Sequence, residues 1–172
     1  MGFRPSVGQG SQRNPAADQR TRRARREVGD VPGRFAHRRC LVPAGMFYEW
    51  QRIPGQRRKQ PYAIGRTDGR PMALAGLWEA WRAPDESREV RTFTIVTTAA
   101  NEDVAALHHR MPVIVEEADW SAWLGEGPGA IRDLLRPSPN GTLRSWPVSP
   151  RVNSPVNNGP ELVEPLALVG AG

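Results

Sequence analysis

The chain has 172 residues, one cysteine and a formal net charge of +6, which suits a single domain with a buried core. The lone Cys40 excludes an intramolecular disulfide and favours a reducing, cytoplasmic location. No apolar run approaches the roughly 18 residues that span a bilayer, and no secretory signal begins the chain, so no membrane partner is predicted.

The excess of basic over acidic residues is confined to the N-terminal segment. Residues 1–39 hold 10 Arg against 3 acids, a net of +7, and the other 133 residues hold 14 basic and 15 acidic groups, a net of −1. Residues 1–33 also show neither helical nor strand periodicity. The sequence therefore predicts an unstructured leader over 1–33 and a folded domain over 34–172.

From Phe35 onward, apolar runs alternate with turn formers. Strands are predicted over 40–44, 46–52, 60–66, 71–81, 92–100 and 112–115. Short helices are predicted over 101–109, with Asn101 as N-cap, and over 116–124 and 129–136. The segment from Arg144 onward is rich in turn formers and is predicted to wrap the surface. Together these elements indicate an α+β domain with a mostly antiparallel sheet and a few short helices.

Glu49 is the first candidate catalytic residue. It lies near the end of the run "CLVPAGMFYEW", after nine residues without charge, and alternation places it on the same face as Phe47. A carboxylate on an apolar face suits general acid–base chemistry, since desolvation raises its pKa. The competing interpretation is that Glu49 ends the strand at the surface.

His108 and His109 interrupt a second apolar stretch, "ALHHRMPVIV". Histidine is the usual proton carrier near neutral pH. Adjacent side chains rarely face the same target, so at most one is expected to be catalytic, and an exposed or structural histidine is the alternative. The histidine and cysteine spacing matches no zinc motif, and no metal or cofactor is predicted.

Five segments in this order resemble the SRAP family, the SOS-response-associated peptidases, also described as abasic-site processing proteins. They are "RRCLVPAGMFYEW", "PMALAGLWEAW", "FTIVTTAAN", "LHHRMPVIV" and "WPVSPRVNSPVNNGPELVEPL". The resemblance covers about Phe35 to Leu168. It implies a barrel-like antiparallel sheet, here incomplete at the N-terminus, in a cytoplasmic DNA-repair protein that is expected to be a monomer.

The resemblance also implies a chemistry. Family members bind single-stranded DNA and capture abasic sites through a Cys at position 2, whose amine forms a Schiff base and whose thiol closes a thiazolidine. The Glu of "FYEW" and the first His of "H-x-R-M-P" support this reaction, and they correspond to Glu49 and His108. His109 falls at a variable position and is expected to point elsewhere.

The N-terminal segment departs from the family pattern. Residue 2 is Gly, and the family's "NAR" motif is absent. When residues 1–27 are back-translated with allowed codons and read one nucleotide further on, the codons permit the sequence W-G-F-V-P-P-W-A-K-D-P, followed shortly by N-A-R-A-E. This is the family's missing segment, including "NAR". We therefore expect an out-of-frame leader, a product impaired in cross-linking for want of the N-terminal Cys, and a cleft left open around Phe47 and Trp78.

Two other functions stay open at this point. The first is a peptidase with Cys40 as nucleophile, which needs an exposed thiol within reach of His108, whereas its apolar sequence context indicates burial. The second is a non-catalytic nucleic-acid-binding protein that relies on the arginine-rich leader.

Overall fold

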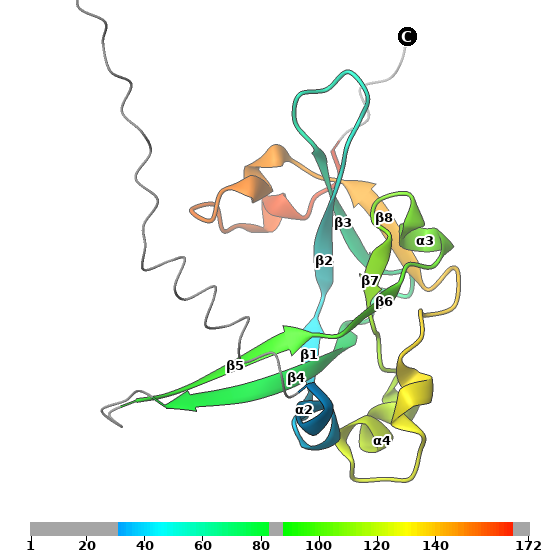
Figure 1. The fold of residues 1–172 in the computed structure, drawn as a ribbon. Helices are drawn as coiled ribbons and strands as arrows, with labels where there is room; N and C mark the ends of the chain where they lie inside the picture. Colours follow the sequence, from blue (N-terminus) through cyan, green and yellow to red (C-terminus); the bar gives the residue numbers. More distant parts are fainter. Residues whose placement is uncertain (1–30, 83–87, 167–172) are drawn as a thin grey trace, which may run out of the picture.

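The structure, a computed structural model, describes residues 31–82 and 88–166 (Figure 1). The predicted leader therefore lies outside the described residues over 1–30, and its last three residues begin a helix. The described helices are α2 (Val31–His37), α3 (Glu102–Ala105) and α4 (Trp120–Leu124). The strands are β1 (Arg39–Ala44), β2 (Met46–Gln51), β3 (Gln60–Arg66), β4 (Met72–Arg82), β5 (Glu89–Ile95), β6 (Thr97–Ala99), β7 (Arg110–Pro112) and β8 (Leu143–Pro147).

The strands form three small sheets in which all pairs are antiparallel. Their orders are β1-β4-β5, β2-β3-β8 and β6-β7. Gly45 separates β1 from β2, so the chain passes directly from the first sheet to the second. The predicted α+β class with antiparallel sheets and short helices is confirmed, although the sheets of the described residues do not close into a barrel.

Two apolar clusters form the core. The first joins all three sheets and α3, since it includes Ile64 of β3, Leu74 of β4, Val104 of α3 and Met111 of β7. The second contains Ala75, Val113 and the fully buried Trp123, with Phe35 of α2 packed against it. Each large side chain buried in this way contributes about 1.5–3 kcal/mol. The clusters anchor α3 and α4 to the sheets and thereby fix the segments that carry the candidate site.

Several element bounds differ from the predictions. The strand expected over 92–100 is divided between β5 and β6, and that expected over 112–115 is β7 followed by an isolated bridge from Ile114 to Leu74. The helix expected over 101–109 ends at Ala105, and that over 129–136 is a 3-10 turn, Ile131–Leu134. The C-terminal segment contains strand β8 before its turns, the 3-10 turns Pro150–Asn153 and Pro160–Leu162. A further 3-10 turn, Glu117–Asp119, precedes α4.

Asn101 holds the N-cap position of α3, but its side chain makes no capping hydrogen bond. Its amide instead donates to the Ser138 carbonyl at 3.1 Å and to Asp103 Oδ2 at 3.1 Å. Because the amide is used in this way, Asn101 ties α3 to the loop before β8. None of the described helices is long and apolar enough to cross a membrane.

Candidate active site

Glu49 lies within β2, two residues before the strand ends. It stands opposite Tyr62 of β3 and is half-buried. Side chains of a strand alternate between its faces, so Phe47, Glu49 and Gln51 share one face. Phe47 packs against the first core cluster. Glu49 is therefore on the core-facing side of β2 rather than at an exposed strand end.

Gln51 connects this face of β2 to the segment that carries His108. Its Nε2 donates a hydrogen bond to the Ala106 carbonyl at 3.0 Å. Ala106 caps the C-terminal end of α3, and Val104 of the same helix belongs to the cluster on which Phe47 packs. The packing of Phe47 and the hydrogen bond of Gln51 thus direct the Glu49 face of β2 toward the loop between α3 and β7, where His108 lies.

His108 is half-buried and is held by the backbone of its own turn. Its Nδ1 lies 3.0 Å from both the backbone nitrogen and the carbonyl oxygen of Arg110, so it can accept from the N–H or donate to the carbonyl. The neutral ring carries its proton on Nε2 in the first case and on Nδ1 in the second. Within the described part of the chain, Nε2 has no hydrogen-bond partner, so it is available for proton exchange.

Arg110 fixes the start of β7 beside the histidine. Its Nη2 donates to the Thr97 carbonyl at 2.5 Å and to the Thr97 hydroxyl at 2.8 Å. These bonds hold the guanidinium across the β6-β7 pair, so Arg110 positions the backbone groups that Nδ1 of His108 contacts.

His109 lies directly beside His108. The two rings have centroids 4.4 Å apart and an interplanar angle of 31°, and His109 is the more exposed. The turn between Ala105 and Arg110 is not extended, so strand-like alternation does not separate these neighbours.

Cys40 lies on β1, opposite Gly76 of β4. It is half-buried, and burial raises the pKa of its thiol. No hydrogen bond joins Cys40 to His108 among the described residues. A thiol with a raised pKa and no base beside it is a poor nucleophile, so this arrangement does not favour a cysteine peptidase.

Gln51 is the part of the candidate site that the sequence analysis missed. The same alternation that pairs Phe47 with Glu49 extends to Gln51, and following it one step further along "MFYEWQ" would have placed all three on one face. Its partner on α3 could not be inferred from local pattern.

Comparison with known proteins identifies the family. The profile of "SOS response associated peptidase (SRAP)" matches residues 12–155. The chain belongs to the SRAP family. The match begins within the segment predicted to be an out-of-frame leader.

Among the SRAP relatives, abasic site processing protein YoqW of Bacillus subtilis is 39% identical over 130 residues, which cover 74% of this chain and 57% of YoqW. Abasic site processing protein HMCES of Pongo abelii is 32% identical over 160 residues, which cover 77% of this chain and 45% of HMCES. The chain thus spans about half the length of the curated relatives it matches.

Solved structures show the same fold. A crystal structure of a Bacteroides thetaiotaomicron protein superposes with a TM-score of 0.71 at 25% identity, covering 81% of this chain and 61% of the other. A Bordetella bronchiseptica protein superposes with a TM-score of 0.60 at 28% identity, covering 69% of this chain and 58% of the other. The SRAP assignment therefore agrees with sequence and fold alike.

Proposed function

We propose that this SRAP chain is a cytoplasmic abasic-site processing protein that binds single-stranded DNA and links covalently to the sugar at an abasic site. One observation carries the proposal. The Gln51–Ala106 hydrogen bond directs the Glu49 face of β2 toward the His108 turn, in a chain 39% identical to a relative named for abasic-site processing.

The proposed chemistry begins with the ring-opened aldehyde of the abasic sugar. An amine attacks the aldehyde carbon, the nitrogen loses a proton, and the hydroxyl of the adduct leaves as water to form an imine. One group must accept the amine proton and another must protonate the leaving hydroxyl. Glu49 and the free Nε2 of His108 are suited to these transfers, and His108 also serves ring opening or reversal.

The nucleophile determines how stable the product is. An amine with a neighbouring thiol can close the imine to a thiazolidine, whereas an amine without one stops at the imine, which hydrolysis reverses. Borohydride reduces the imine to a linkage that survives denaturation, so it traps the adduct whichever amine attacks.

The test measures adducts between the chain and a single-stranded oligonucleotide carrying one abasic site, separated on a denaturing gel. With borohydride, the chain should give a shifted band. Glu49→Gln and His108→Ala should slow its formation about 10²-fold or more, the scale of acid–base groups.

Glu126→Gln and His109→Ala are the matched controls. Glu126 is exposed and distant in sequence from the site, and His109 is the exposed neighbour of His108. Both controls should react at the rate of the unmodified chain. Reaction of Glu49→Gln and His108→Ala at that same rate would overturn the proposed site, and absence of any trapped adduct would overturn the proposed function.

A further inference from the structure

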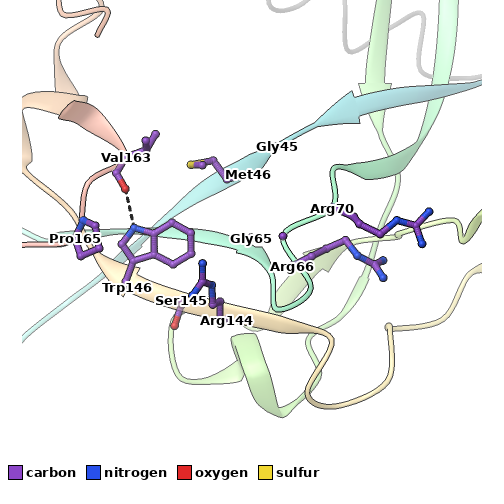
Figure 2. A pocket seen from close by; sticks show the side chains of 11 residues that line it. Gly45, Met46, Gly65, Arg66, Arg70, Arg144, Ser145, Trp146, Val163 and Pro165 are labelled. Carbon is purple, nitrogen blue, oxygen red and sulfur yellow. Dashed lines mark hydrogen bonds between the residues drawn. The ribbon is translucent and has the colours of Figure 1, made fainter. Parts of the chain in front are cut away.

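A pocket of about 480 Å³ lies against the β2-β3-β8 sheet (Figure 2). It is lined by Met46, and alternation along β2 places Glu49 on the opposite face of the sheet. Met46 of β2, Gly65 of β3 and Arg144 of β8 stand side by side in the strand register, so they share this face. Trp146, two residues after Arg144 on β8, belongs to the same face. The volume falls within the roughly 300–1,000 Å³ typical of small-molecule sites.

The indole of Trp146 forms an apolar wall of the pocket. A Cβ at Gly65 would lie 3.3 Å from the Trp146 ring, so the glycine lets the indole lie close to β3. The indole N–H donates to the Val163 carbonyl at 2.8 Å, and this bond is drawn in Figure 2. The ring is therefore held in place before any ligand binds.

Arg144 supplies an unpaired positive charge. Its side chain is exposed, its guanidinium carbon lies 5.2 Å from the centroid of Trp146, and no carboxylate of the described residues pairs with it. Arg66 differs, because Asp68 at 2.7 Å and Glu116 at 2.8 Å hold it, and the bond from Arg66 lowers the pKa of Asp68 to about 2. Arg144 is thus available to an anion, whereas Arg66 is structural.

Arg70, on the far side of the pocket in Figure 2, is intermediate between these two. It pairs with Glu117 at 2.9 Å, but both side chains are more than 60% exposed. Exposed pairs of this kind are screened by solvent and contribute little to stability. Arg70 can therefore exchange Glu117 for a second anionic group at little cost.

We propose that this pocket binds one nucleotide of single-stranded DNA, with the base against Trp146 and a phosphate at Arg144. A fixed aromatic ring beside an unpaired guanidinium is the combination that sequence-independent single-strand binding uses. Tyr48 and Trp50, whose ring centroids are 6.4 Å apart, continue the aromatic side chains along this face of β2.

The inference rests on the proposed function and extends it to a second contact. Within the described residues, β2 is an edge of its sheet and pairs only with β3. Glu49 and Met46 belong to opposite faces of this edge strand. A DNA strand that crosses the edge can therefore place an abasic sugar at Glu49 and a neighbouring nucleotide in the pocket.

The experiment measures binding of the full chain to a fluorescent oligothymidylate of about 15 nucleotides, by anisotropy over a salt series. Arg144→Glu should weaken binding about tenfold and reduce the slope of log affinity against log salt by about 0.7, one phosphate contact on a single strand. Arg132→Glu is the control, since Arg132 is exposed, makes the same charge change and does not line the pocket.

Gly45→Phe tests the pocket without changing charge. Gly45 lines the pocket, and a Cβ there meets nothing within 4 Å, so a large side chain at this position can narrow the pocket without a clash. It should weaken binding at least fivefold while far-ultraviolet circular dichroism stays unchanged.

Equal weakening by Arg144→Glu and Arg132→Glu, or unweakened binding by Gly45→Phe, would overturn the proposal. The oligonucleotide has no abasic site, so these outcomes are independent of the Glu49 chemistry. A chain that forms no adduct but loses binding through Arg144→Glu would contradict the proposed function alone.

Discussion

The side chain of Gln51 donates to the backbone carbonyl of Ala106 across 55 positions of sequence. The bond joins the last residue of β2 to the end of α3, and Glu49 lies two residues before one partner while His108 lies two residues after the other. Any change in this bond alters the relative placement of the two proposed acid–base groups. Gln51 is therefore a positioning residue for them.

Gln51→Leu removes this donor while keeping a side chain of similar size. We expect the borohydride-trapped adduct to form about fivefold more slowly, because the Glu49 and His108 segments are less well aligned. Affinity for the abasic oligonucleotide should change less than twofold, since Gln51 itself is not expected to contact DNA. Rapid-quench trapping and anisotropy measure the two quantities, and a loss confined to affinity would argue against a positioning role.

Asp103 of α3 should be important for stability. Its carboxylate accepts backbone N–H bonds from Gly141 at 2.8 Å and Leu143 at 3.0 Å, and so fixes the start of β8. Asp103→Ala leaves both donors without this partner and should lower the free energy of unfolding by about 2 kcal/mol. Urea denaturation measures the change. Glu102→Ala, at the exposed neighbouring position, should change it by less than about 0.5 kcal/mol.

Trp123 is the largest fully buried side chain, and its indole N–H donates to the Cys40 carbonyl at 2.9 Å. Trp123→Ala should lower the free energy of unfolding by about 3–5 kcal/mol, because it empties the second core cluster. Trp81→Ala is the comparison, since Trp81 is 42% exposed. If chemical denaturation gives the two variants equal losses, the packing of α4 described above is wrong.

The Cys40 thiol should react slowly with iodoacetamide at neutral pH. Burial raises its pKa, and only the thiolate is nucleophilic. The rate of this alkylation should begin to rise at a higher pH in the folded chain than in the chain unfolded by urea. The same shift means that the folded state favours the protonated thiol. The contribution of Cys40 to stability is therefore complete at a pH below the thiol pKa of the unfolded chain, and it is lost as pH rises through the higher thiol pKa of the folded chain. Cys40→Ser should remove the reaction, and equal rates in the folded and unfolded chains would contradict the shift.

Local pattern predicted the strands that have clear apolar runs, such as Gln60–Arg66 and Met72–Arg82. It failed for β8 because Pro147 and the prolines before the strand indicate turns. Proline is tolerated there because β8 is an edge strand, which leaves some backbone N–H groups unpaired. The pairing of β8 with β3 joins residues about 80 positions apart, and such contacts leave no trace in local periodicity.

The candidate site divides in the same way. Alternation along β2 groups Glu49 with Phe47, since that depends only on strand geometry. Which element that face meets depends on the Gln51–Ala106 contact, and the ring contact between His109 and His108 depends on the shape of a short turn. Neither follows from residue type. The roles of Glu49 and His108 remain predictions to be tested by the adduct experiment.

The pairing of β4 has a consequence for how the domain opens. Strand β1 covers Met72–Leu77 of β4 and β5 covers Gly76–Arg82, so the two neighbours overlap only at Gly76 and Leu77. Among the described residues, β5 is the only strand paired with Trp78–Arg82 of β4, and β5 is largely exposed. Arg38 also contacts the start of this part, through the Trp78 backbone and the Glu79 side chain, so Ala80 to Arg82 depend most on β5. Amide protons of Ala80 to Arg82 should therefore exchange through local separation of this ribbon, while those of Leu74 and Ala75 should exchange only when the core unfolds. The single strand β4 thus belongs to two units that unfold separately. The two units meet at Gly76, where an added Cβ would lie 2.8 Å from the Cys40 sulfur.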